Sequence, residues 1–466
     1  MPIFSHPSRH RPPGSHVLRR RLVAHSTSRT VRDPLWQNVH LDAAAAAVVD
    51  TPEFQRLRRV KQLGFAHLVY PGAVHNRFLH AVGVYHLTRR AIEALERKGQ
   101  VDRLDDLSRR TIPEIELAAL LHDVGHYAFS HAMEELEPDA IPGHHEEVAD
   151  QFLESPGIRA ALGELGAGAV QRIGDLIRGR SQHPLQGLVS GSLDLDKIDY
   201  LRRDSLFCGV PYGAVDVDRL LDSLTLARES ESDPLEVAVT EKGISALESL
   251  MFAKYQMFRN VYWHHAVRSA TVAFRRLVEG ALDAELLLRE ELAGPTDEEL
   301  LNLLDARMED GEAPTILRTL LTALVDRRLP KRTVELLGDE LPEGIADWLP
   351  HRRDLVRRVE DRLAEDRGLE PGNVFLDYPA NPRMLELRLL LVRRRGEVIR
   401  LTSEGEAGLI DLPRLGRSLH HTTRVLRVFS LEPTGRWNPE PLLDLLASEE
   451  DVVEQRLESG EPIYTG

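Results

Sequence analysis

The chain has 466 residues, of which 42% are hydrophobic, and a net charge of -15. A chain of this length can hold two or three domains with a large buried core, and no run of about 18 apolar residues marks a membrane span. We therefore expect a cytoplasmic protein with no membrane partner. The acidic balance and the aromatic content of 5% argue against a general nucleic-acid-binding protein. The single cysteine, Cys208, excludes an internal disulfide framework and a cysteine zinc site.

The first 28 residues contain five arginines and no acidic residue, with Pro, Ser and Gly between them. This composition predicts a disordered basic arm over residues 1–28. It is not a secretory signal, because no apolar segment follows the basic residues. We expect the arm to precede a catalytic domain over residues 29–281 and a C-terminal region over residues 282–466.

From Asp33 to about Ala281, apolar residues recur at helical spacing, which predicts a mostly helical segment. The clearest examples are Leu57, Val60 and Leu63, and then Leu117, Leu120, Leu121 and Val124. Pro113 and Glu114 stand at the start of the second example, as residues at the first turn of a helix do. We therefore expect a helical catalytic core.

The helical pattern continues to about residue 370, through Glu298–Leu301 and Leu317–Leu321, and then changes. Met384–Arg394 and Glu397–Thr402 are apolar and basic runs on either side of an Arg-Gly pair, which predicts two strands joined by a turn. Val425–Phe429 is a further predicted strand. The fold class is therefore mostly α, with a smaller α+β C-terminal region and no internal repeat.

Histidines concentrate between residues 75 and 145, and one short motif there indicates metal chemistry. His122 and Asp123 are adjacent, so on a helix they project about 100° apart and can reach one ion. His126 would follow one helical turn later on the same face. A carboxylate buried beside imidazoles is costly without a cation. A helix cap or a satisfied core pair is the structural alternative.

Two ligands are too few for a metal, and His80 and Asp196 are the candidates that complete the set. The order is then His, His-Asp and Asp, on separate predicted helices. Nitrogen and oxygen ligands with open positions suit Fe, Mn, Zn, Co or Ni, and such an ion can acidify water. The sequence therefore predicts a divalent metal ion at this site.

This ordered set resembles the H…HD…D signature of the HD-domain phosphohydrolases. The surrounding motifs resemble one branch, the deoxynucleoside triphosphate triphosphohydrolases, in the short bacterial form related to the SAM- and HD-domain protein. The resemblance covers roughly residues 30–280 and is loose beyond them. It is carried by Asp50–Arg58, Lys61–Gly64, Pro71–Phe78, His122–Glu134, Asp196–Asp204 and Tyr255–His264. It implies an HD-domain helical core.

The resemblance also implies a role for each residue that matches a family motif. The implied metal ligands are His80, His122, Asp123 and Asp196. The implied catalytic residues are His131 paired with Glu134, and the further active-site histidines His126 and His145, where the adjacent His144 leaves an ambiguity of one position. The implied substrate-binding residues are Gln62, Arg77, Lys197, Tyr200, Asp204, Lys254 and Tyr262. Lys254 stands where the family usually has arginine, so it keeps the charge but loses bidentate geometry.

The implied reaction is hydrolysis of a deoxynucleoside triphosphate to a deoxynucleoside and inorganic triphosphate. The metal would bind the α-phosphate and generate hydroxide, with Mg accompanying the triphosphate. Arg77, Lys197 and Lys254 would balance the phosphate charge. His131, held by Glu134, would protonate the departing 5′-oxygen. Tyr262 would crowd a 2′-hydroxyl, although core packing alone would also account for Tyr200 and Tyr262.

A regulatory function follows from the same resemblance. Asp50, Gln55 and Arg58 match residues with which relatives recognise a guanine nucleotide activator, and a carboxylate and an arginine suit the guanine edges. Arg29, Arg327 and Lys331 match positions that supply cations to the activator's phosphates. Together they predict a homotetramer whose interfaces are completed by nucleotide. Ordinary surface salt bridges are the alternative.

Two other functions are compatible with the motifs. The first is an HD phosphohydrolase that acts on another nucleotide phosphoester, because a shared fold does not determine the substrate. The second is a catalytically silent nucleotide sensor, which the intact ligand set argues against.

Overall fold

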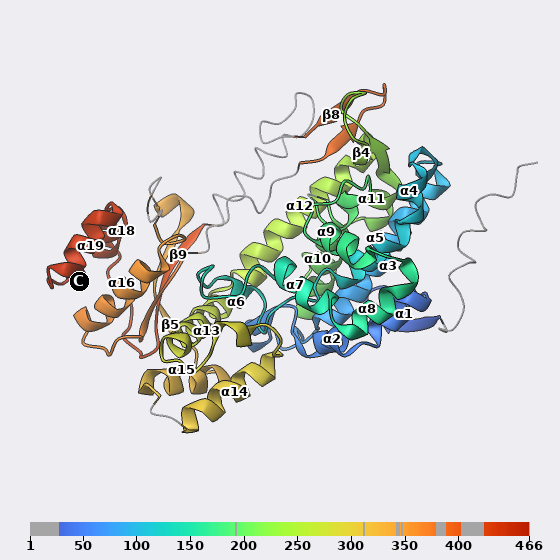
Figure 1. The fold of residues 1–466 in the computed structure, drawn as a ribbon. Coiled ribbons are helices and arrows are strands. Elements are labelled where there is room, and N and C mark those ends of the chain that lie inside the picture. Colours follow the sequence, from blue (N-terminus) through green and yellow to red (C-terminus); the bar gives the residue numbers. More distant parts are fainter. Residues whose placement is uncertain are drawn as a thin grey trace, which may run out of the picture.

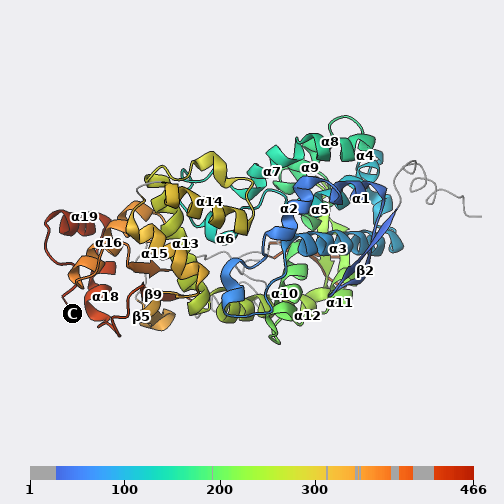
Figure 2. The ribbon, with the colours of Figure 1, turned by 90° about the horizontal axis from the view of Figure 1, so that it is seen from below.

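The computed structural model describes residues 28–191, 193–310, 313–341, 345, 348–378, 388–401 and 424–465. Most described residues are helical, which confirms the predicted fold class, and the helices gather into two lobes (Figure 1). The first lobe holds α1 to α12 and the second holds α13 to α19, as the view from below also shows (Figure 2). The predicted basic arm lies outside the described residues except for Ser28.

The helices of the first lobe are α1 Ala43–Val49, α2 Pro52–Arg56, α3 Arg77–Arg97, α4 Asp106–Arg110, α5 Ile112–Leu121, α6 His131–Glu134, α7 His145–Leu153, α8 Pro156–Leu162, α9 Ala169–Ile177, α10 Leu195–Cys208, α11 Val217–Ser223 and α12 Ile244–Met257. Those of the second lobe are α13 His265–Asp283, α14 Asp297–Asp310, α15 Thr315–Val325, α16 Arg353–Asp366, α18 Glu440–Leu446 and α19 Glu450–Glu458. The expected helices at 298–301 and 317–321 are therefore present as α14 and α15.

Helices α3, α5 and α10 form the centre of the first lobe and carry the predicted metal ligands. Helix α5 is buried from Glu114 to Leu121, as expected for a helix that is apolar nearly all round. Helix α3 begins at Asn76, whose side chain accepts a hydrogen bond from the Leu79 backbone N–H. Asp194 caps α10 in the same way, through the backbone N–H of Lys197. These two caps place the first turns of α3 and α10 next to the site.

The strands form three small antiparallel or mixed sheets. They are β1 Arg29–Asp33, β2 Gln37–Leu41, β3 Leu224–Ala227, β4 Glu236–Thr240, β5 Lys331–Leu337, β6 Val374–Asp377, β7 Leu390–Val392, β8 Val398–Arg400 and β9 Val425–Ser430. The sheet orders are β1-β2, β3-β4-β7-β8 and β5-β9-β6. Strand β7 runs parallel to β4, so a C-terminal segment completes a sheet of the first lobe.

The strands expected in the C-terminal part are confirmed where the structure describes them. β7 and β8 pair antiparallel around Gly396, whose φ of 84° suits a residue without a side chain. Of the predicted pair, residues 384–387 and 402 lie outside the described residues. The predicted strand Val425–Phe429 is β9, the central strand of the third sheet.

Three local predictions were wrong. Leu57, Val60 and Leu63 do not lie on one α-helix, because a short 3-10 helix covers Leu57–Arg59 and Val60 is extended. Helix α5 ends at Leu121, so His122 and Asp123 follow the helix, and His126 is not one helical turn further on. The segment expected to be helical also contains β2, β3 and β4, since hydrophobic spacing alone does not separate short buried strands from helices.

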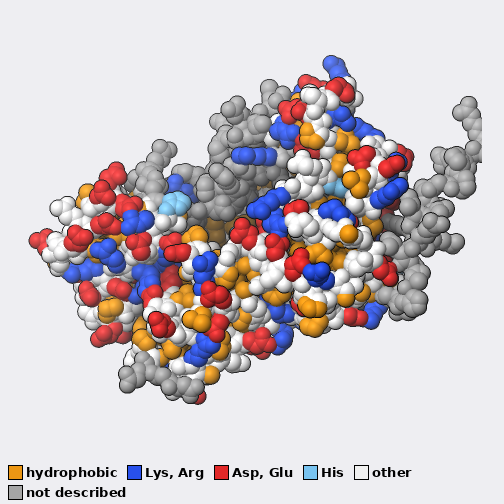
Figure 3. All heavy atoms as spheres, in the orientation of Figure 1, with side chains coloured by type: hydrophobic (Ala, Val, Ile, Leu, Met, Phe, Trp, Pro, Cys, Tyr) orange, Lys and Arg blue, Asp and Glu red, His pale blue; other side chains and the backbone are white. Residues whose placement is uncertain are grey.

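The second lobe is built around two further apolar clusters. One contains residues of α13, α14 and α15 together with Phe375 and Phe429, and the other packs α16, α18 and α19 against the third sheet. On the face drawn in Figure 3, acidic and basic side chains are interspersed over both lobes. Among the described residues, no helix combines the length and the apolar character that crossing a bilayer requires.

Candidate functional site

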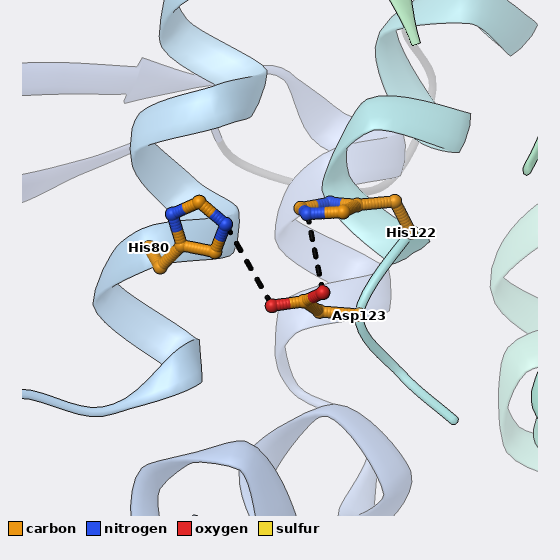
Figure 4. A group of neighbouring side chains, drawn as sticks. All are labelled: His80, His122 and Asp123. Atoms are coloured by element: carbon orange, nitrogen blue, oxygen red, sulfur yellow. Dashed lines mark ion pairs between the residues drawn. The ribbon is translucent and has the colours of Figure 1, made fainter. Parts of the chain in front are cut away.

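Three elements of the first lobe bring the four predicted metal ligands together. His80 lies in the first turn of α3, His122 and Asp123 follow the end of α5, and Asp196 lies in the first turn of α10. Figure 4 shows the imidazoles of His80 and His122 on either side of the Asp123 carboxylate. His80 is fully buried and Asp123 is 3% exposed. The site therefore lies at the junction of three helices, with His80 and Asp123 buried and Asp196 partly exposed.

The ligand atoms lie within reach of one ion. His80 Nε2 is 2.8 Å from Asp196 Oδ1 and 3.7 Å from Asp123 Oδ2. His122 Nε2 is 3.3 Å from Asp123 Oδ1 and 3.7 Å from Asp196 Oδ1. The ligand atoms of His80, His122 and Asp123 all lie within 4.8 Å of one another.

The hydrogen bonds of the two imidazoles test whether a metal fits. His122 Nδ1 is 2.9 Å from the carbonyl oxygen of Ala119, and His80 Nδ1 is 2.8 Å from Asp199 Oδ2. Both Nδ1 atoms therefore donate, which leaves a lone pair on each Nε2. Neither buried Nε2 atom makes an aligned hydrogen bond with any described residue, although both face carboxylate oxygens. Lone pairs that face carboxylates need a cation between them, so this donor set fits a divalent metal ion.

The electrostatics of the cluster favour positive charge at the same place. Burial opposes a charge on His80, but Asp196, Asp199 and Asp123 raise its pKa to about 10. Burial would likewise raise the pKa of Asp196, yet the two histidines hold it well below its usual value. The carboxylates are therefore ionised and attract a cation, which a bound metal supplies.

A buried chain of hydrogen bonds fixes the orientation of His80. The carboxylate of Asp199 accepts from Arg203 Nε at 2.7 Å and Nη2 at 2.9 Å, and also from the Trp36 indole. Arg203 Nη1 donates to Asp33 Oδ2 at 2.8 Å. Asp199 and Arg203 are fully buried. The β1–β2 hairpin is thus tied to a metal ligand, in the way that outer carboxylates orient metal-binding histidines.

A second cluster lies beside the metal site and contains His126, His131, Glu134 and His145. His131 Nδ1 is 3.2 Å from Glu134 Oε2, and His145 Nδ1 contacts Glu134 Oε1. The rings of His126 and His145 stack with centroids 3.8 Å apart, and His126 Nε2 is 3.1 Å from Asp123 Oδ1. The neighbouring His144 is exposed, so the geometry favours His145 at the ambiguous position.

The protonation states within this second cluster differ. Burial lowers the pKa of His126 well below its usual value, and Arg77 and His145 add to the effect. Burial would raise the pKa of Glu134, but hydrogen bonds from His131 and His145 lower it well below the usual value. The side chain of His131 is 72% exposed. His126 is therefore neutral and Glu134 is anionic, and His131 is the most exposed of the three histidines in this cluster.

One cavity of about 910 Å³ joins both clusters and is lined by most of the residues predicted from sequence. Such a volume accommodates a nucleotide-sized ligand. Its lining includes Gln62, Arg77, His122, Asp123, His126, His131, Glu134, His145, Asp196, Lys197, Tyr200, Asp204, Lys254 and Tyr262. The structure thus brings together every candidate catalytic and substrate-binding residue. Their individual roles stay predictions.

The cations are distributed around the metal cluster. Arg77 is buried and donates from Nη1 to Asp123 Oδ2 at 2.6 Å and from Nε to Ser130 Oγ at 2.7 Å, while its Nη2 has no described partner. Lys197 Nζ contacts Asp194 Oδ2 at 2.6 Å. Burial and, to a smaller extent, the charge of Lys197 lower the pKa of Lys254 to about 8.

Another part of the cavity is lined by polar groups around Asp204. Tyr262 Oη donates to Asp204 Oδ2 at 2.7 Å, and His75 Nε2 is 2.8 Å from Asp204 Oδ1. The rings of Tyr200 and Tyr262 meet edge to face with centroids 6.4 Å apart. The buried Oε1 atom of Gln62 has no described hydrogen-bond partner, which leaves it available to a hydroxyl group.

The predicted activator residues lie on other elements. Asp50 pairs with Arg29 at 2.5 Å, so β1 contacts the end of α1. Arg58 Nε donates to Gln55 Oε1 at 2.8 Å, and its guanidinium lies 3.5 Å above the Phe78 ring. Arg327 Nε donates to the Leu68 carbonyl at 2.6 Å. Lys331 is the first residue of β5 and is exposed.

Comparison with known proteins agrees with this geometry. Residues 77–203 match the HD domain, and residues 215–407 match the HD associated region. The HD match contains all four candidate metal ligands. This chain belongs to the HD-domain proteins, with an HD associated region that follows the HD domain. The metal-binding character that the family implies agrees with the donor set described above.

Three similar proteins show how much of the chain the similarity covers. An uncharacterized protein of Methanocaldococcus jannaschii is 29% identical over 79% of this HD-domain protein and 73% of its own length. The deoxynucleoside triphosphate triphosphohydrolase SAMHD1 homolog of Dictyostelium discoideum is 27% identical over 75% of this chain and 66% of its own length. The crystal structure of a phosphohydrolase from Bacteroides thetaiotaomicron has a TM-score of 0.65 and 22% identity, and covers 87% of this chain and 100% of that one. The last likeness shows the fold.

Several residues of the site were not identified from the sequence of this HD-domain protein. Asp199 follows Asp196 by three residues on one face of α10, a spacing that could have indicated its place beside His80. His75 was given no role in the site from the sequence, and it is buried against Asp204. No local signal marks Arg203 and Asp33 as partners, because they are far apart in the chain.

Removal of a metal ligand tests the centre directly. His122→Ala and Asp123→Ala should each lose the bound transition metal and nearly all turnover while the protein stays folded, because the three remaining donor groups hold the ion much more weakly than four. Inductively coupled plasma mass spectrometry measures the metal, and circular dichroism checks the fold. His351→Ala, which changes an exposed histidine, is the control and should keep the metal. Full activity in a metal-free ligand variant would contradict the assignment.

Proposed function

We propose that this protein hydrolyses deoxynucleoside triphosphates to deoxynucleosides and inorganic triphosphate. One observation carries the proposal: a single cavity is lined by metal ligands, by cations that include Arg77, Lys197 and Lys254, by a histidine–carboxylate pair and by the polar groups around Asp204. A triphosphate needs the cations, and a sugar hydroxyl suits the polar groups. The Dictyostelium relative named above bears this activity in its name, which supports the same substrate class.

Different residues along the cavity bind the metal and the phosphates. His80, His122, Asp123 and Asp196 would hold a divalent metal, which when bound would supply Lewis acidity and an acidified water molecule. The unpartnered Nη2 of Arg77 and the ammonium groups of Lys197 and Lys254 hold the phosphates.

His131 acts as general acid toward the departing 5′-oxygen, and Glu134 orients its ring and stabilises its protonated form. The exposed edge of His131 lines the cavity, so a leaving group can reach it. His145 shares Glu134 and stacks on the neutral His126, which limits the positions that Glu134 can adopt.

Asp204 lies in the part of the cavity that we assign to the sugar. Its carboxylate is held by Tyr262 and His75, so it presents a fixed acceptor for a 3′-hydroxyl, with Gln62 as a second acceptor. The Tyr262 ring then occupies the space that a 2′-hydroxyl requires. This arrangement favours deoxyribose over ribose.

Product analysis with all eight common nucleoside triphosphates tests the substrate class. Deoxynucleoside triphosphates should release inorganic triphosphate at least about tenfold faster than ribonucleotides, a difference of about 1.4 kcal/mol in transition-state binding. Anion-exchange chromatography separates triphosphate from orthophosphate, and the Asp123→Ala variant is the blank. Equal rates on ATP and dATP would contradict the proposed preference for deoxyribose over ribose. Orthophosphate as the product would indicate a different phosphoester reaction, and no product would indicate a nucleotide sensor.

The pKa of Lys254 predicts how activity depends on pH. Below pH 8 the ammonium group is charged and attracts the triphosphate, and above pH 8 the charge is lost, so kcat/KM should fall as pH rises through about 8. Arginine stays charged throughout this range. Lys254→Arg should therefore abolish the decline between pH 7 and 9. An identical decline in both proteins would assign it to another group.

We also propose activation by a guanine nucleotide in a homotetramer. Asp50, Gln55 and Arg58 offer a carboxylate, an amide and a guanidinium within one small region of α1, α2 and the following turn. A carboxylate accepts from the guanine N1 and N2 groups, and a guanidinium donates to O6 and N7. The Arg29–Asp50 pair indicates that β1 takes part in the same surface. Arg327 and Lys331 would supply phosphate contacts from the second lobe.

Kinetics with added GTP or dGTP tests the activation. Dilute wild-type protein should show a lag or sigmoidal rate that the nucleotide relieves, with a shift to tetramer in light scattering. Asp50→Ala should abolish this response and leave the metal content unchanged. Asp106→Ala removes an exposed carboxylate from α4 and should respond like the wild type. Hyperbolic kinetics that are indifferent to guanine nucleotides would contradict the proposal.

A further inference from the structure

Helix α6 carries His131 and Glu134 but has only four residues, so it cannot be stable by itself. The two residues before it, Phe129 and Ser130, have φ angles of 55° and 45°, in the left-handed region that is unfavourable for residues with side chains. Such a conformation persists only where the surroundings hold it. The position of His131 therefore depends on contacts outside the helix.

The apolar face of this segment packs into the second lobe, although the segment lies within the HD domain match. Phe129, Ala132, Met133 and Leu136 belong to the apolar cluster that contains residues of α13, α14 and α15. The ring of Phe129 stacks on Phe65 at 4.4 Å and packs against Phe274 of α13 at 4.7 Å. Figures 1 and 2 both show α6 at the junction of the lobes, beside α13.

Asp297, the first residue of α14, holds the chain before α6. Its Oδ1 atom accepts from the Phe129 backbone N–H at 2.8 Å, and its Oδ2 atom accepts from the Lys61 backbone N–H at 3.0 Å. Asp297 is 1% exposed, so no solvent competes for these bonds. A buried carboxylate that accepts backbone N–H groups forms strong, directional bonds.

Arg268 of α13 holds the chain after α6. Its Nη1 and Nη2 atoms donate to the two carboxylate oxygens of Glu135 at 2.6 Å and 2.8 Å. Arg275, two turns further along α13, adds a contact of 3.3 Å to the same carboxylate. Arg268 also donates to Asp377 at the end of β6, at 2.6 Å. Its own position is therefore fixed by the third sheet.

We propose that Asp297 and Arg268 are positioning residues that place His131 for proton transfer by holding the two ends of α6. Asp297, Arg268 and Asp377 all lie in the HD associated region, whereas α6 lies in the HD domain. The associated region thus completes the acid–base machinery of the HD domain. This inference rests on the proposed role of His131 as general acid and adds the groups that make the role possible.

Two variants loosen the two ends separately, and each has a matched control. Asp297→Ala removes the bonds before α6, and Asp305→Ala removes an exposed carboxylate of the same helix. Glu135→Ala removes the contact after α6 while Arg268 keeps Asp377, and Asp139→Ala removes an exposed carboxylate from the following loop. Should Asp297→Ala not fold, Glu135→Ala still decides the question.

Both test variants should lower kcat by about 10- to 100-fold with little change in KM or metal content, because proton transfer depends on sub-ångström placement. Deuterium uptake of residues 127–136 should accelerate in both test variants and in neither control. In a His131→Ala background, adding Asp297→Ala or Glu135→Ala should cause no further loss, because the group they position is already absent.

Unchanged deuterium uptake, or losses that multiply in the double variants, would overturn the inference, since multiplying losses indicate damage that does not act through His131. If the wild-type protein releases no triphosphate from deoxynucleotides, the proposed function fails. Deuterium uptake then still decides whether the associated region holds α6.

Discussion

Two imidazole lone pairs and two carboxylates face one another at the predicted metal site. These groups repel one another, so the arrangement requires a positive charge between them. A contact at Nδ1 fixes the orientation of each imidazole: the Ala119 carbonyl oxygen for His122 and the Asp199 carboxylate for His80. Asp199 is held by Arg203, and Arg203 donates to Asp33 in the N-terminal hairpin. Much of the first lobe can therefore be understood as the support that three helices and a hairpin give to one ion site.

The second lobe supports the neighbouring chemistry. The metal ligands belong to the core of the first lobe, whereas the segment with His131 and Glu134 packs into the core of the second. Arg77 links the two halves of the site, because it contacts Asp123 on one side and Ser130, next to His131, on the other. The predicted metal ligands held by the first lobe thus lie beside a histidine–carboxylate pair that the second lobe supports.

The sequence was sufficient for the fold class, for α14 and α15 of the second lobe and for the strands around Gly396, since the spacing of apolar residues and the residues at turns are local signals. The four ligand positions followed from residue type and order. The end of α5 was missed because His122 keeps helical backbone angles. The helical spacing of the side chains therefore continues past Leu121, the last residue of the helix. The partners of Arg203 and Phe129 could not be predicted, because Asp33 and Asp297 lie far away in the chain and share no motif with them. Which cavity residues touch substrate stays a prediction.

The parallel pairing of β7 with β4 has a consequence for how the chain folds. Between β6 and β7 the chain leaves the second lobe for a sheet of the first, and between β8 and β9 it goes back. A contiguous fragment that ends near residue 281 would lack the partner of β4 and expose an unpaired strand edge, which promotes aggregation. The lobes are therefore interleaved along the chain, and their unfolding should be one cooperative transition despite the two-lobed outline.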